Sequence, residues 1–185
     1  PTPLSIVEER TVGPDLGKDS IKSGVISLIV GFVLVILFMF YKYKLFGLVA
    51  NVTLIANLIM LLGILTILEA TLTLPGIAGI ILTVGMAVDA NVLIFERIKE
   101  ELKTEKSIIH AFHIGYLKAR ITVLDANITT LIAAIILFAF GSGPVKGFAI
   151  TLGIGIITTL FSAYFLARHL TSIIVLNKKE GQVNL

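Results

Sequence analysis

The 185-residue chain has no cysteine, which excludes a disulfide framework and a zinc cluster with cysteine ligands. It also has no G-x-S-x-G, H-E-x-x-H or Walker A motif, so the common signatures of hydrolases and nucleotide-binding enzymes are missing. Charge is sparse, at 15% of residues, and the net charge of +3 is small. That balance gives no reason to expect nucleic acid as a partner. We therefore expect neither an enzyme nor a cofactor.

What the chain has is long hydrophobic runs, with 56% hydrophobic residues and a mean hydropathy of +1.00. About 20 apolar residues cross a bilayer, and five runs approach or reach that length. Each run is continuously apolar instead of alternating, which favours helices over a barrel. The sequence predicts an all-α, polytopic membrane protein with five transmembrane helices, at about 24–41, 46–68, 74–95, 121–140 and 148–166.

Basic residues are divided unevenly between the connections. By the positive-inside rule, the side with more Lys and Arg is cytoplasmic. We therefore expect the N-terminus outside and the C-terminus inside, as five spans require. The heavier side holds Lys42, Lys44, Arg97, Lys99, Lys103, Lys106, Lys118, Arg120, Arg168, Lys178 and Lys179, and the other side Arg10, Lys18, Lys22 and Lys146.

The remaining segments divide around a membrane domain at 21–170. Residues 1–20 are predicted to end a periplasmic region and lead into the first span, and an earlier span and an exported domain are expected before them. Residues 96–120 are predicted to form a cytoplasmic connection of two surface helices, the second beginning near Ser107. Residues 171–185 are a cytoplasmic tail. His110 and His113 have no third ligand nearby, so we predict no metal site.

Small residues recur at every fourth position in two of the runs. Gly79, Thr83 and Ala87 do so in the third, and Gly147, Thr151 and Gly155 in the fifth. Such spacing lets helices approach closely. We expect these positions to serve packing.

Asp89 lies inside the third run, in Val-Asp-Ala-Asn at 88–91. An ionised carboxylate near a bilayer centre costs about 3 kcal/mol on insertion scales. Such a group usually faces a partner or a water-filled path, and its neutral form is favoured. The residue is therefore a candidate for proton or ion movement.

A second Asp-Ala-Asn begins at Asp125, near the start of the fourth run. Asp89 is seven residues before Glu96 and Asp125 five residues after Arg120, about 10 Å and 7 Å along a helix. In antiparallel spans the two carboxylates have similar depth, and if they face each other they could share a proton. Asp125 could equally be hydrated or favour its helix start. Asn91, Asn127, Thr129 and Thr130 are expected to support them as interhelical hydrogen-bond formers.

Two buried aspartates also satisfy the count for an intramembrane aspartyl protease, although no other feature supports peptide hydrolysis. Four longer segments carry a more specific resemblance. They are Thr-Val-Gly-Pro-Asp-Leu-Gly at 11–17, the run from Pro75 to Leu102, Asp-Ala-Asn-Ile-Thr-Thr-Leu-Ile-Ala-Ala at 125–134, and Gly-Ser-Gly-Pro-Val-Lys-Gly-Phe-Ala-Ile-Thr-Leu at 141–152. These segments resemble the SecD branch of the SecD/SecF family, within the resistance-nodulation-division superfamily, over nearly the whole chain.

The resemblance implies a component of the bacterial inner membrane that uses the proton gradient to assist preprotein export. It implies SecF and the SecYEG channel as partners, acting after the SecA motor. It further implies spans two to six of a six-span half, proton conduction at Asp89 and an assisting role for Asp125. Two alternatives remain: a proton-coupled exporter of lipids or drugs from the same superfamily, and a purely structural membrane anchor.

Overall fold

The computed structural model describes residues 14–104 and 107–177. Every regular element in these two stretches is helical, so the predicted all-α class is confirmed. The predicted segment at 1–20 and the tail at 171–185 lie partly outside them. The elements are α1 (Pro14–Ile67), α2 (Leu74–Glu101), α3 (Ile108–Phe140), α4 (Pro144–Phe161), the π-helix η1 (Ser162–Ala167) and α5 (Arg168–Asn177).

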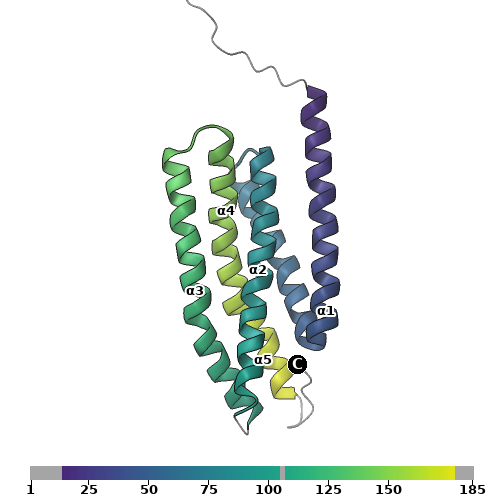
Figure 1. Ribbon diagram of the computed structural model, residues 1–185, viewed down its shortest axis with the longest axis vertical. Helices are drawn as coiled ribbons and strands as arrows, with labels where there is room; N and C mark the ends of the chain where they lie inside the picture. The colour runs from purple at the N-terminus through teal and green to yellow at the C-terminus, as the bar shows by residue number, and fades with distance from the viewer. Residues whose placement is uncertain (1–13, 105–106, 178–185) are drawn as a thin grey trace, which may run out of the picture.

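α1 is a helical hairpin rather than one straight helix. Its helical geometry breaks at Lys44, with φ 48° and ψ −113°, and the chain reverses there (Figure 1). Gly47 permits the reversal, because a Cβ at that position would overlap the main-chain carbonyl of Met39. The Asn51 amide then donates to the Ile36 carbonyl at 3.1 Å and ties the two arms together. We call residues 14–43 the outer arm and residues 45–67 the inner arm.

The hairpin reconciles the helix count with the predicted spans. Four helical segments in the described part of the chain are long and apolar enough to cross a membrane. α1 contains nearly all of the first two predicted runs, α2 and α3 contain the third and fourth, and α4 with η1 contains the fifth. The chain therefore passes along the bundle five times.

Two helices continue well beyond the apolar runs that predicted them. α2 continues to Glu101, and α3 begins at Ile108, so most of the predicted connection at 96–120 extends the two spans. Ser107 is the N-cap residue of α3, although its side chain makes no capping bond. The extensions pack on each other because Gly115 lies directly against Ile98, where a Cβ would clash. They are part of the bundle and not separate surface helices.

The small residues of the third and fifth runs form the closest helix contact. A Cβ on Gly79 would overlap the Thr151 hydroxyl, and one on Gly155 would overlap the Thr83 side chain. α2 and α4 therefore approach closely, as the spacing predicted. They lie at the centre of the bundle, with α3 on one side and the outer arm of α1 on the other (Figure 1).

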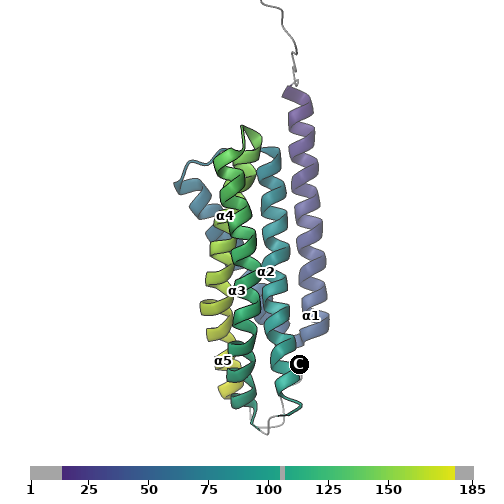
Figure 2. The same cartoon turned by 60° about the vertical axis from the view of Figure 1, so that its left-hand side comes forward.

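The outer arm is the least covered part of the bundle. Its apolar side chains are largely exposed, including Ile29 at 56% and Leu34 at 62%, and Figure 2 shows the arm standing at the edge. The α1 reversal, the end of α2 and the end of α5 all lie at the opposite end of the bundle from Pro14 (Figure 1). We call this the basic end, because the three basic connections meet there.

Candidate functional site

Asp89 opens onto a groove between α2 and α3. The groove has a volume of about 320 Å³, and its lining includes Asn127 and Thr130 from α3 with Met86 and Leu93 from α2. The Asp89 side chain is exposed and has no hydrogen bond or ion pair to any residue in the described ranges. An ionisable group thus lies on the flank of a bundle whose neighbouring surface is apolar.

Asn91 is only two residues away but faces the opposite side of α2, because two residues advance a helix by about 200°. It is 2% exposed. Its amide donates to the Ala87 carbonyl at 3.1 Å and lies 3.5 Å from the Thr53 hydroxyl on the inner arm of α1. Asn91 therefore contributes to helix contact and lies outside the Asp89 groove.

The inner arm makes a second polar contact of this kind. Asn57 is buried, and its amide donates to the Thr159 hydroxyl of α4 at 3.2 Å. Together with the Thr53–Asn91 pair, it joins the inner arm to both central helices. In a bilayer such bonds contribute about 0.6 kcal/mol on average.

The α3 residues divide between two faces in the same way. Asn127 is buried in the groove, where its amide donates to the Val123 carbonyl at 2.8 Å. Thr130 also lines the groove and donates to the Ala126 carbonyl at 2.9 Å. Both bonds stay within α3, so neither side chain bridges to α2. The side-chain oxygens of Asn127 and Thr130 can each accept a hydrogen bond from a donor in the groove.

Asp125 and Thr129 are not among the residues that line the groove. Asp125 is two residues before Asn127, so it lies about 200° around α3 from that groove residue. Both side chains are exposed, and the Thr129 hydroxyl donates to the Asp125 carbonyl at 2.8 Å. The structure therefore does not bring the two aspartates face to face, and the shared-proton arrangement has no geometric support in this chain.

A second cavity lies next to the groove, toward the basic end. It has a volume of about 340 Å³ and is lined by Glu96, Arg97, Glu100 and Lys118, among others. Leu93 lines both cavities. We call this second cavity the charged vestibule; because it shares Leu93 with the Asp89 groove, the two cavities are adjacent.

The helical spacing of residues in the sequence indicates the vestibule, although a hydropathy profile does not detect it. Leu93, Glu96 and Glu100 follow Asp89 by 4, 7 and 11 residues, which places all four on one face of a helix. Glu96 is held there by the Tyr43 hydroxyl, which donates to it at 2.8 Å, and by Lys42 at 3.4 Å. The α1 reversal therefore positions one carboxylate of the vestibule.

Metal binding finds no support in the described residues, where no group of three His, Asp or Glu side chains could hold an ion. The polar side chains that line the Asp89 groove are one carboxylate, one amide and one hydroxyl, from Asp89, Asn127 and Thr130. This set can hold and pass a proton, and it contains no nucleophile paired with a base.

Comparison with known proteins gives a consistent result. The family model described as protein export membrane protein SecD/SecF, C-terminal, matches residues 2–177. The protein translocase subunit SecD of Desulfurispirillum indicum is 58% identical over 185 residues, which cover 100% of this chain and 36% of that protein. The subunit of the same name from Magnetococcus marinus is 55% identical over 179 residues, 97% of this chain and 34% of that protein.

A solved structure has the same fold. The crystal structure of SecDF, a translocon-associated membrane protein from Thermus thermophilus, matches with a TM-score of 0.86 and 44% identity. The match covers 89% of this chain and 23% of that one. The chain spans about a third of the length of the relatives it matches.

Proposed function

The chain belongs to the SecD/SecF family of protein-export membrane proteins, and on that premise we propose that it serves proton-driven preprotein export across a bacterial inner membrane. Its partners in this proposal are SecF and the SecYEG channel, with SecA delivering the preprotein. The chain is a multi-pass membrane protein, and we assign its basic end to the cytoplasm by the positive-inside rule.

The exposed carboxylate of Asp89 is the observation that carries the proposal. An ionised carboxylate facing hydrocarbon costs about 3 kcal/mol. The Asp89 side chain, on the flank of this bundle, must therefore be either covered by another protein segment or protonated. A second helical half, which SecF would supply, provides the cover. The groove is then closed to lipid, and the charged vestibule, which shares Leu93 with it, lies next to it toward the basic end.

A proton on Asp89 changes the charge of the groove. In this proposal, that change couples the proton gradient to movement of the two helical halves. The charged form attracts a partner's polar groups, whereas the neutral form tolerates apolar contact. Asn127 and Thr130 can accept or donate at the groove wall. Moving one charge across 100 mV releases about 2.3 kcal/mol, so a substantial mechanical step needs several protons.

Substitution of Asp89 tests the proposal. Asp89→Asn is nearly isosteric and removes the titrating group, so it should abolish gradient-dependent export while the protein stays inserted and bound to its partners. Asp89→Glu keeps the group but moves it by one methylene, and should retain partial activity. The measurement is preprotein release from spheroplasts, with and without an imposed proton gradient.

Asp125→Asn is the matched control, since it removes an equivalent carboxylate from the other face of α3. It should cause a milder loss than Asp89→Asn. If Asp89→Asn released preprotein at the wild-type, gradient-dependent rate, the proton-relay proposal would fail. The structural-anchor alternative would then stand.

A further inference from the structure

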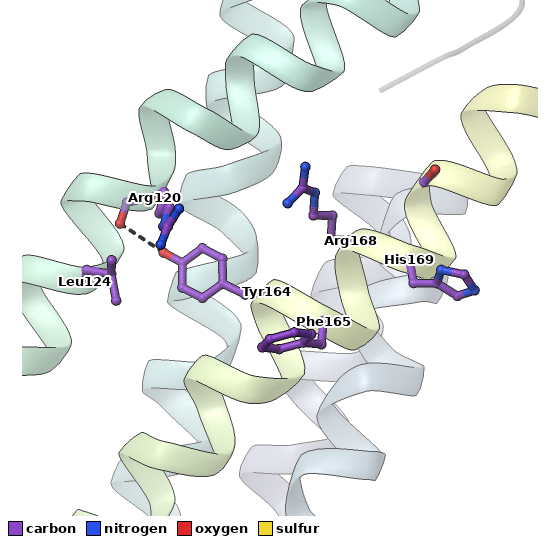
Figure 3. A pocket seen from close by; sticks show the side chains of 7 residues that line it. Arg120, Leu124, Tyr164, Phe165, Arg168 and His169 are labelled. Atoms are coloured by element: carbon purple, nitrogen blue, oxygen red, sulfur yellow. Dashed lines mark hydrogen bonds between the residues drawn. The ribbon is translucent and has the colours of Figure 1, made fainter.

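A cavity of about 500 Å³ lies between α3 and the η1–α5 segment, on a different face from the Asp89 groove. Arg120 contributes from α3, and Arg168 and His169 contribute from α5 (Figure 3). We propose that this basic pocket binds the phosphate headgroup of an anionic phospholipid. The inference goes beyond the proposed function and uses none of the groove residues.

Among the described residues, no carboxylate compensates the positive charge of the pocket. None of its lining residues is an aspartate or a glutamate. Within residues 14–104 and 107–177, neither Arg120 nor Arg168 forms an ion pair with a carboxylate. The Arg168 guanidinium instead lies 5.9 Å from the centre of the Tyr116 ring. Two cations on facing walls leave their N–H groups available, and arginine donors match phosphate oxygens in geometry.

The depth of the pocket matches that of a lipid headgroup. Arg120 directly precedes the apolar run at 121–140, and Arg168 follows the run at 148–166 by two residues. Both arginines therefore lie at the boundary between hydrocarbon and water at the basic end. Basic pockets between transmembrane helices at this level are suited to anionic lipid headgroups.

One edge of the pocket is apolar and open. Phe165 is 67% exposed on the η1 wall, and Leu124 lies on the α3 wall, with Tyr164 between them (Figure 3). These two side chains continue the lipid-facing surface, so a headgroup in the pocket could keep its acyl chains against the protein. A free phosphate ion would gain nothing from this edge. The combination therefore favours a phospholipid over a soluble anion.

The π-helix shapes the wall that carries Tyr164 and Phe165. η1 occupies Ser162–Ala167 between two α-helical segments, and such wide turns are rare and often occur at functional sites. The Tyr164 hydroxyl donates to the Arg120 carbonyl at 3.0 Å. This bond fixes the spacing of the two walls without using the Arg120 guanidinium.

Lipid retention in native mass spectrometry tests the pocket. The detergent-purified protein is titrated with phosphatidylglycerol or with phosphatidylcholine of the same acyl chains. We expect preferential retention of phosphatidylglycerol. Arg120→Gln and Arg168→Gln should each weaken it about fivefold, because one basic residue near an anionic surface contributes a factor of about that size. Both side chains are exposed, so thermal melting should change little, by no more than the loss of the weak contact between Arg168 and the Tyr116 ring.

Lys103→Gln is the matched control: it removes one exposed positive charge from the same end and lies outside the pocket. It should leave retention unchanged. An equal loss in Lys103→Gln, or equal retention of phosphatidylcholine, would overturn the assignment to this pocket.

Two further measurements distinguish a bound phospholipid from other occupants of the pocket. Phe165→Ala should weaken phosphatidylglycerol retention, and soluble glycerol phosphate should not displace the lipid at equal concentration. Equal displacement would mean that the pocket recognises a free phosphate, and the lipid assignment would fail. It would also fail if the arginine variants kept the lipid but lost a protein partner, because the pocket would then be a protein contact.

Discussion

Glu101 is a nearly buried carboxylate, 7% exposed, at the contact between α2 and α3. It accepts hydrogen bonds from the Lys118 ammonium at 2.9 and 3.1 Å and lies 3.4 Å from the Arg97 guanidinium. Removing one partner of a fully buried ion pair costs about 3–5 kcal/mol. Here both cations are nearly half exposed, so they can be hydrated when the carboxylate is removed.

We therefore predict that Glu101→Gln lowers the free energy of unfolding by about 1.5 kcal/mol, at the lower end of the cost of a lost charged hydrogen bond. The measurement is the unfolding midpoint in mixed detergent micelles. Glu100→Gln is the control, because Glu100 is exposed and, among the described residues, its carboxylate forms an ion pair only with Arg97. Its effect should stay within about 0.5 kcal/mol. Equal effects of the two substitutions would contradict a special role for Glu101.

At the same scale, the sequence located the ionisable residue of the groove better than it predicted how the neighbouring residues are arranged. Asp89 could be identified because the rarity of a carboxylate in an apolar run does not depend on the fold. The pairing with Asp125 rested on equal depth alone, and depth says nothing about rotation around the helix. Asn127, two residues on, faces the groove, together with Thr130 one turn further along α3. Direction around α3 is set by its packing against α2, which sequence spacing does not reveal.

Among the elements, the contact between α2 and α4 depends on the absence of side chains. We predict that Gly79→Ala destabilises the protein by about 1–3 kcal/mol, the usual cost of overpacking, because the added methyl would overlap the Thr151 hydroxyl. Gly85→Ala is the control on the same helix, where a Cβ would meet nothing within 4 Å. It should be neutral or stabilise by up to about 1 kcal/mol. Unfolding midpoints in detergent would show the difference, and similar values for both would refute close packing at Gly79.

The elements also differ in how far they could be predicted. Hydropathy located every span, since each apolar residue adds to the run independently of tertiary contacts. It underestimated α2 and α3, because the last turns of α2 and the first turns of α3 lie outside the apolar runs but are held together by the approach of Gly115 to Ile98. The π-helix η1 was beyond prediction, because α- and π-helical turns use the same apolar residues. A wide turn arises only from packing against the neighbouring helices.

For the whole molecule, the arrangement of charged connections predicts the orientation of the bundle in the membrane. The reversal at Lys44, the connection between α2 and α3, and the end of α5 lie at one end of the bundle (Figure 1). The connections between the inner arm and α2, and between α3 and α4, lie at the other end. Lys146 is the basic residue next to those two connections in the sequence, and the outer arm, with Lys18 and Lys22, begins at the same end. The fold thus places fewer described basic residues at this end, as the positive-inside rule requires of an outer face.

Single-cysteine labelling checks this orientation, and the absence of native cysteine gives it a clean background. Lys146 and Thr104 are exposed at opposite ends of the bundle. With a membrane-impermeant maleimide, Lys146→Cys should react in intact spheroplasts, whereas Thr104→Cys should react only after permeabilisation. Reaction of both from the outside would mean that α3 does not cross the membrane. That result would overturn the five-span topology with an outer N-terminus and a cytoplasmic C-terminus. Reaction of Thr104→Cys alone would invert the bundle, and the charged vestibule beside Asp89 would then open to the outside, where a proton enters instead of leaving.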